Sequence, residues 1–386
     1  MSVSDQSQTD ATHVGHVAPV NLEHKPDPHE TRWGDFLKAC MKLGGSDLIM
    51  KSGLAPRLRL KGALKALDTE PVSGTEFMQI ARAILTEEQF GDLHKFGSVD
   101  FAYDYDDNTR FRVNLFQARG KLSVAARLIT SDILPFEKLH LPPVMADIAM
   151  QPQGIVLLCG VTGSGKSTTI ASMLDYVNAR SPVHILTIED PIEYIFEDKK
   201  AVINQREIGI DCLDFKIALR ALVRENPDIV LVGEMRDQET FEAALHAAET
   251  GHLVYGTIHA SSTTQTFSRI YGLFEQEEVE QVRKILAYQM RAFVYQKLLP
   301  TLHENIPRIP AVEILMGNGV TRTHVLEARE GELREYLNTI EAKQMGMLDF
   351  NEALVQLVEQ EYIHLRTAME ATPNKDELQM RLKGIG

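Results

Sequence analysis

Apolar residues recur with two different periods along the first third of the chain. Residues 31–44 place them at helical spacing and predict an amphipathic helix, and residues 76–97 predict two more. Residues 58–67 and 99–129 instead alternate apolar and polar side chains, as strands with one buried face do. The sequence therefore predicts an α+β domain with an antiparallel sheet over residues 32–132.

The pattern changes to strand–helix alternation after a proline-containing segment at residues 133–146, which we interpret as a linker. Four short apolar runs follow, and each is typical of a strand buried in a parallel sheet. The runs lie at residues 154–159, 184–189, 228–234 and 252–259, and predicted helices lie at residues 167–179, 215–224 and 238–250. A parallel sheet covered by helices is therefore expected within residues 147–365, which makes the chain an α/β protein.

Three further segments complete the predicted organisation. Residues 1–31 are polar and are expected to be a disordered tail. Residues 263–358 form a more helical portion, in which residues 282–299 predict a core-facing helix. That helix would bury Val282, Ile285, Leu286, Met290, Phe293 and Val294. Residues 366–386 are expected to be a C-terminal tail, either weakly structured or helical.

Composition and charge exclude several classes of protein. Acidic side chains outnumber basic ones by 54 to 40, and the net charge of -14 argues against general nucleic-acid binding. The cysteines Cys40, Cys159 and Cys212 are too few and too far apart for a disulfide framework or a four-cysteine zinc site. The chain has no bilayer-length apolar run and no signal-like N-terminus. We therefore expect a cytoplasmic protein that reaches a membrane only through partners.

The most specific chemical motif is GVTGSGKST, residues 160–168, which matches the pattern G-x-x-x-x-G-K-[ST] in full. It follows a predicted strand and opens a predicted helix, as that pattern requires. We expect the backbone N–H groups of the loop to bind the phosphates of ATP, Lys166 to bridge the β- and γ-phosphates, and Ser167 to bind Mg²⁺. The predicted nucleotide-binding residues are Gly160, Thr162, Gly163, Ser164, Gly165, Lys166, Ser167 and Thr168.

The segment NPDIVLVGEMRD, residues 226–237, raises a question about the acid that helps to hold the metal. The corresponding strand of many ATPases ends on an aspartate. Here Gly233 follows the apolar run, and the acid comes one residue later as Glu234. We expect Glu234 to be the favoured general base and to contribute to the metal site.

A second acidic cluster, Glu189, Asp190 and Glu193, follows the strand predicted at residues 184–189. Carboxylates at the carboxyl edge of a parallel sheet face the ligand crevice. We therefore expect this cluster to compensate for the missing aspartate. Asp190 is the predicted metal-side acid, Glu193 is the second candidate for the general base, and Glu189 is a further candidate catalytic acid.

Two histidines frame the strand predicted at residues 252–259. A lone histidine is more often a structural residue than a catalytic one. His259, at the strand end that faces the ligand, is nevertheless a candidate sensor of the γ-phosphate. His252 opens the same strand.

The predicted strands of the first domain concentrate arginine, with Arg110, Arg112, Arg119 and Arg127 within 18 residues of an acidic chain. Phosphoryl transfer needs positive charge on the developing oxyanions, and a neighbouring subunit often supplies an arginine for it. The alternative is a solvated basic face of the sheet. We favour an inter-subunit catalytic role for these arginines.

These motifs together resemble those of secretion-type ATPases, and they are most similar to those of the type IV pilus retraction ATPases typified by PilT and PilU. The shared motifs, in chain order, are GVTGSGKSTT, ILTIEDPIEY, VINQREIG, RENPDIVLVGEMRD, AAETGHLVYGTIHA and QKLLP. They lie within a resemblance that covers residues 33–365, which is nearly all of the predicted folded chain.

The resemblance implies both a fold and an assembly. It implies a PAS-like N-terminal domain and a RecA-like ATPase domain with a helical C-terminal portion, in subunits that form a homo-hexameric ring, with a paralogous retraction ATPase as a further partner. It also implies that the ring hydrolyses ATP with Mg²⁺ at the inner membrane, at the pilus base. There it would act through a platform protein to drive pilus retraction and twitching motility.

The resemblance assigns roles to individual residues as well. Glu234 falls at the atypical Walker B glutamate of the family, and Glu193 falls at an acid of its Asp box. Arg112, Arg119 and Arg127 lie where the family places its inter-domain or inter-subunit arginines.

Some departures leave the role within the family open. Ile49 stands where the family has a histidine, and THVLEARE, residues 323–330, replaces the signature AIRNLIRE. The C-terminal extension is more like that of PilU. The alternatives are an assembly or type II secretion ATPase and an accessory subunit that hydrolyses ATP weakly and coassembles with a paralogous motor. Assembly and secretion ATPases usually carry an extra N-terminal domain and a tetracysteine zinc site, neither of which this sequence contains.

Overall fold

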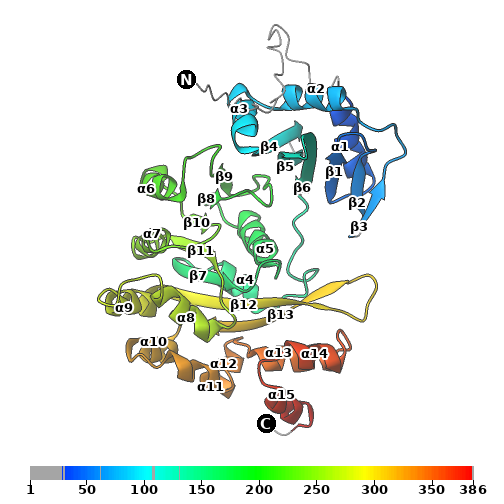
Figure 1. Cartoon of the computed structure of the whole chain (residues 1–386). Coiled ribbons are helices and arrows are strands. Elements are labelled where there is room, and N and C mark those ends of the chain that lie inside the picture. The colour runs from blue at the N-terminus through cyan, green and yellow to red at the C-terminus, as the bar shows by residue number, and fades with distance from the viewer. Residues whose placement is uncertain (1–27, 29–30, 61, 107–108, 130, 385–386) are drawn as a thin grey trace, which may run out of the picture. The chain divides into compact units, whose positions relative to one another are not determined.

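The computed structural model describes residues 28, 31–60, 62–106, 109–129 and 131–384 (Figure 1). The chain divides into two compact units, residues 1–128 and residues 129–386, which we call unit 1 and unit 2. Both units combine helices with a sheet, so the predicted mixed α/β architecture is confirmed. Most of the predicted tail at residues 1–31 lies outside the described residues.

Unit 1 contains a six-stranded sheet in the order β3-β2-β1-β6-β5-β4. Its strands are β1 (Asp47–Lys51), β2 (Arg57–Leu60), β3 (Ala63–Ala66), β4 (Ser98–Asp106), β5 (Thr109–Ala118) and β6 (Lys121–Ile129). In β5, Phe111, Val113 and Leu115 are fully buried, and the residues between them are more exposed. The predicted alternation is confirmed, and one face of this strand is apolar while the other is polar.

Three helices pack with the apolar residues of this sheet in one core. They are α1 (Arg32–Lys42), α2 (Gly74–Ile84) and α3 (Glu87–Phe96). Thr31, Ser73 and Thr86 precede these helices, and each side chain accepts a hydrogen bond from a backbone N–H of the first turn. Gly97 ends α3 in the left-handed region with φ 79°. Local sequence therefore sets the helix ends of unit 1.

Unit 2 contains a seven-stranded sheet in the order β13-β12-β7-β11-β10-β8-β9. Its strands are β7 (Gly154–Cys159), β8 (His184–Glu189), β9 (Val202–Glu207), β10 (Ile229–Val232), β11 (Leu253–Ile258), β12 (Met290–Pro300) and β13 (Arg308–Met316). Strands β7 to β12 pair in parallel, and β13 pairs antiparallel with β12. Every residue of β7, β10 and β11 is buried, as expected for strands covered on both faces.

Helices cover both faces of this sheet (Figure 1). One core contains α4 (Val144–Ala149) and α5 (Lys166–Asn178), together with Phe136 and Leu141 of the predicted linker. The other core contains α6 (Phe215–Glu225), α7 (Gln238–Glu249), α8 (Thr263–Tyr271), α9 (Val279–Gln289), α10 (Gly319–Leu326), α11 (Leu333–Tyr336) and α12 (Ile340–Gln344). The short η2 (Glu330–Glu332) precedes α11. None of the helices in the described part of the chain combines the length and apolar character needed to cross a bilayer.

The prediction of a helix over residues 282–299 is wrong beyond Gln289. Helix α9 ends at Gln289, and the chain continues directly into β12, where Met290, Phe293 and Val294 are buried. Both faces of β12 are covered at its start, so its apolar residues do not alternate with polar ones and were mistaken for helical spacing. Strand β13 was also missed within the portion predicted to be helical.

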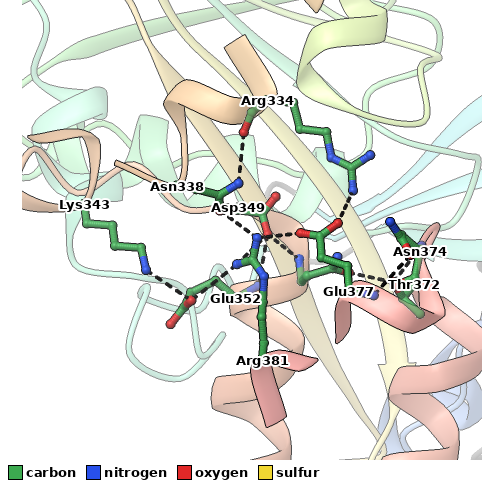
Figure 2. Close-up of polar contacts among 10 residues, drawn as sticks. Arg334, Asn338, Lys343, Asp349, Glu352, Thr372, Asn374, Glu377 and Arg381 are labelled. Atoms are coloured by element: carbon green, nitrogen blue, oxygen red, sulfur yellow. Dashed lines mark hydrogen bonds and ion pairs between the residues drawn. The ribbon is translucent and has the colours of Figure 1, made fainter. Parts of the chain in front are cut away.

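The last part of the chain contains α13 (Phe350–Glu359), α14 (Leu365–Ala371) and α15 (Lys375–Leu382). Helix α13 packs on β13, α14 packs on β12, and α15 packs on α13. The predicted tail at residues 366–386 thus includes helical residues, and Leu378 of α15 is fully buried. Figure 2 shows Arg381 of α15 among the carboxylates of Asp349 and Glu377, at 3.1 and 2.6 Å. Glu377 also pairs with Arg334 at 2.8 Å. Apolar burial and this network of ion pairs together hold α15 in place.

The three cysteines are free thiols. Cys40 and Cys159 are fully buried, and Cys212 is partly buried. Burial raises the pKa of the Cys40 thiol to about 11 and that of the Cys159 thiol to about 12. All three are described residues, and none forms a disulfide.

Candidate active site

The predicted phosphate-binding loop connects β7 to α5. Gly160, Gly163 and Gly165 have φ values of 148°, 77° and 89°, in the region that favours glycine. No atom of the described residues lies within 4 Å of the point where a β-carbon of Gly163 would stand, so the loop is open there. Helix α5 begins directly after the loop, and the N–H groups of its first turn lack partners within the helix. The loop therefore has the backbone shape and the helix N-terminus that suit a phosphate group.

Lys166, the first residue of α5, folds back over this loop. Its Nζ atom donates hydrogen bonds to the carbonyl oxygens of Gly160 at 2.9 Å and Val161 at 3.1 Å. Burial lowers the pKa of Lys166, and the negative charge of Glu234 opposes that effect. The ammonium group thus stands at the loop, where its carbonyl partners can be exchanged for phosphate oxygens.

Three hydroxyl groups of the loop differ in their surroundings. The side chain of Ser164 is buried, and its Oγ atom has no hydrogen-bond partner among the described residues. Thr168 contacts the hydroxyl of Tyr194 at 2.7 Å. Ser167 is exposed, and its hydroxyl has no bond to another described side chain. The hydroxyl of Ser167 is therefore available to a ligand.

Glu189, the last residue of β8, is a buried carboxyl group. Its Oε1 atom accepts hydrogen bonds from the Thr187 hydroxyl at 2.7 Å and from Gln205 Nε2 at 3.4 Å. Burial raises its pKa to about 7 in spite of these bonds. A carboxyl group with a pKa near neutrality can take up or release a proton under physiological conditions.

Glu234, just beyond β10, contacts two basic side chains. Arg236 approaches its Oε2 atom at 2.5 Å, and His259 Nε2 lies 3.0 Å from its Oε1 atom. The hydrogen bond from Arg236 lowers the pKa of Glu234, and the charges of Arg236, His259 and Lys166 add to that effect against partial burial. Glu234 is therefore held as a carboxylate beside the phosphate-binding loop.

His259 joins the acidic strand end to this loop. Its Nδ1 atom lies 3.1 Å from the carbonyl oxygen of Gly160, while its Nε2 atom contacts Glu234. Both partners are hydrogen-bond acceptors, so the two contacts form together only when both ring nitrogens carry a proton. His252 does not join the site, because it precedes β11 and contacts the carbonyl oxygen of Ala247 at 2.8 Å.

Asp190 and Glu193 are exposed and follow β8. The pKa of Arg236 is raised, first by its hydrogen bond to Glu234 and also by the charge of Asp190. Glu193 provides a backbone hydrogen bond to the carboxyl of Glu189. The structure therefore gathers the four predicted acids at the carboxyl edge of β8 and β10.

The donor set suits a magnesium ion. Within the described ranges, no three His, Cys, Asp or Glu side chains are grouped closely enough to hold a metal by themselves. Mg²⁺ in nucleotide sites takes only one or two protein oxygens and completes its shell with phosphate oxygens and water. The hydroxyl of Ser167 and the carboxylates of Asp190 and Glu234 are oxygen donors of that kind.

The three predicted arginines lie in unit 1, whereas the other predicted site residues lie in unit 2. Arg112 of β5 and Arg127 of β6 line a pocket of ≈ 190 Å³ on the polar face of the sheet. Arg127 Nε lies 2.9 Å from Asp47 Oδ1. Arg112 is exposed and forms no ion pair with another described residue, and Arg119 lies exposed in the turn before β6 with φ 54°. Arg112 and Arg119 are therefore the freer of the three cations.

Sequence reasoning missed two residues of this site. Arg236 was visible two positions after Glu234 in the segment VGEMRD, and the short spacing is the signal that points to their contact. Gln296 contacts the phosphate-binding loop from β12. It opens the shared motif QKLLP, but that motif assigned the residue no role, and the segment around it was predicted to be helical.

The chain resembles known proteins over most of its length. Residues 103–374 match the family model described as "Type II/IV secretion system protein". The chain is 38% identical over 336 residues to the "Type IV pilus retractation ATPase PilT" of Pseudomonas aeruginosa, covering 87% of this chain and 96% of that protein. It is 32% identical over 348 residues to the "Type IV pilus ATPase PilU" of the same organism, covering 90% of each.

A solved structure supports the same resemblance. The structure entitled "Crystal Structure of the Pilus Retraction Motor PilT and Bound ADP" matches with a TM-score of 0.83 and 39% sequence identity. The match covers 90% of this chain and 98% of that chain. The similarity therefore extends to the fold of nearly the whole molecule.

Proposed function

Because the chain belongs to the type II/IV secretion system protein family, in its PilT and PilU branch, we propose that it is a motor ATPase that drives type IV pilus retraction. The observation that carries the proposal is the contact of His259 with both Gly160 and Glu234. This contact joins the phosphate-binding loop to the acidic strand end, which are the two parts that phosphoryl transfer requires.

In this proposal ATP binds at the loop of residues 160–168. The backbone N–H groups of the loop and of the first turn of α5 bind the phosphates, and Lys166 exchanges its two carbonyl partners for phosphate oxygens. Ser167, Asp190 and Glu234 would hold Mg²⁺, which would neutralise charge on the phosphates. The open space at Gly163 and the free Ser167 hydroxyl support this arrangement.

Hydrolysis needs a base that orients and deprotonates the attacking water. Glu234 is ionised and fixed by Arg236 and His259, so we assign the orientation of water to it. Glu189 is buried at the end of the neighbouring strand β8, and its raised pKa of about 7 makes it a further candidate acid at this edge of the sheet. Glu193 remains the second candidate for the base, since its exposed carboxylate follows the same strand. His259 contacts both the loop and Glu234, so we assign it the role of γ-phosphate sensor.

The arginines of unit 1 act in an assembly. We propose a homo-hexamer in which unit 1 is PAS-like, unit 2 is RecA-like, and Arg112, Arg119 or Arg127 stabilises the transition state at a junction between subunits. A symmetric ring provides six equivalent junctions of this kind. A paralogous retraction ATPase is a further member of the ring, and an inner-membrane platform protein receives its motion at the cytoplasmic side of the pilus base.

Two measurements test the function. Purified full-length protein is expected to hydrolyse ATP, and Lys166→Ala is expected to abolish turnover, because the variant lacks the cation that bridges the phosphates. Cells that lack the gene are expected to keep surface pili but to lose retraction and twitching. Parental turnover in Lys166→Ala would contradict the nucleotide site, and loss of pili from the deleted cells would indicate an assembly ATPase instead.

A further inference from the structure

The phosphate-binding loop rests on a buried side-chain amide. Gln296 lies in β12, which pairs in parallel with β7 up to the pair Tyr295 and Cys159, so Gln296 stands beside the loop where it leaves the sheet. Its side chain is 2% exposed. A polar side chain at such a depth needs partners for both its donor and its acceptor.

Both partners of this amide belong to the loop and to the start of α5. Gln296 Nε2 donates to the carbonyl oxygen of Ser164 at 2.8 Å, and Gln296 Oε1 accepts from the hydroxyl of Thr169 at 2.8 Å. Because a carbonyl can only accept, the nitrogen of the amide must face Ser164, which fixes the orientation of the whole group. The amide therefore links the loop, at Ser164, to the first turn of α5, at Thr169.

Two glycines of the loop lie directly against Gln296. A β-carbon on Gly160 would lie 2.5 Å from the backbone oxygen of Gln296, and a β-carbon on Gly165 would lie 2.7 Å from its Nε2 atom. Glycine is thus required at these two positions for two reasons: the backbone conformation and the close approach of Gln296. A neighbouring strand, rather than the loop alone, sets the loop's shape.

We infer that Gln296 is a positioning residue, which holds the loop in its phosphate-binding shape before the nucleotide arrives. The inference rests on the proposed nucleotide site and adds a residue outside the motif to it. Preorganisation reduces the ordering that binding must impose, so the bridge strengthens the binding of any nucleotide that places a phosphate in the loop. Both ADP and ATP do so, and both are expected to depend on Gln296.

The test compares Gln296→Met with the parent in the full-length protein. Methionine keeps the length of the side chain and removes both hydrogen bonds. Loss of two buried hydrogen bonds is expected to weaken ADP and ATP binding about tenfold. Turnover at saturating ATP should fall less than about threefold, which is no more than the effect of losing one hydrogen bond. The effect is small because Gln296 touches no reacting atom. Titration with a fluorescent ADP analogue and steady-state kinetics measure the two quantities.

The chain offers a matched control for the cost of losing a buried amide. Asn351 is 1% exposed, and its Oδ1 atom accepts from the hydroxyl of Thr372 at 2.6 Å. Figure 2 shows Thr372 beside the ion pairs of the C-terminal helices. Asn351→Leu therefore removes a similar bond from a different core, and it is expected to lower the melting temperature without weakening nucleotide binding.

A second pair of variants addresses the same bridge from its other end. Thr169→Val removes the hydroxyl and should weaken ADP binding about fivefold. Thr169→Ser keeps the hydroxyl and should bind ADP with the parental affinity. These variants decide the question if Gln296→Met does not fold. They also separate loss of the hydrogen bond from loss of packing, because valine and threonine are similar in shape.

The outcomes distinguish the inference from the proposed function. Weaker binding in Gln296→Met and Thr169→Val, with parental binding in Asn351→Leu and Thr169→Ser, supports the inference. Parental ADP affinity in Gln296→Met or Thr169→Val overturns it, while turnover by the parent leaves the proposed function standing. Failure of the parent itself to bind ADP or ATP overturns both.

Discussion

The Cα atom of Glu189 lies 3.3 Å from the point that a β-carbon on Gly233 would occupy. Glu189 ends β8 and Gly233 follows the neighbouring β10, with its N–H donating to the carbonyl oxygen of Ile188 at 2.8 Å. An aspartate after β10 would therefore press a second carboxylate against a buried one. The two strands carry one buried acid between them, and it stands on β8.

Substitution of Gly233 is expected to destabilise the fold in proportion to the group that is added. Gly233→Ala should cost about 1 kcal/mol through overpacking, and Gly233→Asp about 3 kcal/mol because a charge is also brought close to Glu189. Gly319→Asp is the control, since no atom in the described part of the chain lies within 4 Å of its β-carbon position. Urea unfolding measures all three. Equal stability of Gly233→Asp and the parent would show that the strand ends separate readily.

Glu189 is expected to make stability depend on pH. Its pKa is raised from 4.5 to about 7 in the folded protein, so the folded state binds this proton more tightly than the unfolded state does. The resulting stability is present below pH 4.5 and is lost as the pH rises to about 7, by about 3 kcal/mol. Glu189→Gln should lack this fall. Urea unfolding of both proteins without nucleotide, across this range, compares them, and parallel pH profiles would contradict the raised pKa.

The two histidines beside β11 are expected to respond differently to substitution. His259→Ala removes the link between Gly160 and Glu234 and should lower kcat for ATP at least about tenfold, with little change in melting temperature. His252→Ala serves as its pair, because the His252 side chain hydrogen-bonds to Thr250 and to the carbonyl oxygen of Ala247, at the end of α7 and away from the loop. It should change stability and leave kcat near the parental value. Equal effects on kcat would remove the distinction.

The sequence pointed to candidate residues that the structure brings together, but not to the contacts around them. The loop, Glu234, His259 and the acidic cluster could be proposed because motif residues and strand ends are local in sequence. Arg236 and Gln296 act through contacts made by the folded chain, and Gln296 lies 132 residues from its partner Ser164. Tertiary contacts at such separations leave no periodic signal.

In the fold, too, elements marked by local sequence were predicted, and elements that depend on tertiary contacts were not. Strands with one buried face, such as β5, alternate visibly and were predicted, as were the four strands of unit 2 that are bounded by turn residues. Strand β12 begins without a loop after α9, and its first five residues include four buried ones, so neither a boundary nor an alternation marked it. The C-terminal helices depend on ion pairs across elements, such as Arg381 with Asp349, which sequence spacing does not reveal.

Arg112 is expected to act on the nucleotide of a neighbouring subunit. Arg112→Ala and Lys166→Ala should each be inactive alone, since each lacks one side of the junction. Mixed and reassembled at equal amounts, they should recover activity at about a quarter of the junctions, where an intact Lys166 meets an intact Arg112. Arg57→Ala, another exposed arginine of unit 1, is the control and should remain active by itself. Absence of recovery would contradict action between subunits.

Removal of Arg381 is expected to loosen the C-terminal helices. Arg381→Ala leaves the buried Asp349 without its cation and should cost about 3 kcal/mol. Arg366→Ala breaks the exposed pair with Glu370 and should cost less than about 0.5 kcal/mol. Unfolding in urea and limited proteolysis near α15 measure both. A loss in Arg366→Ala as large as that in Arg381→Ala would show that burial of Asp349 is not the cause.

The burial of the native thiols makes the chain a convenient background for site-specific labelling. Alkylating reagents attack the thiolate, so Cys40 and Cys159, which are fully buried and have raised pKa values, should react slowly. Cys212→Ser then removes the partly buried thiol. Cysteines introduced at the exposed positions Phe96 of unit 1 and Leu213 of unit 2 would each accept a fluorophore. Energy transfer between such dyes would test, in real time, whether the distance between the two units changes during ATP turnover.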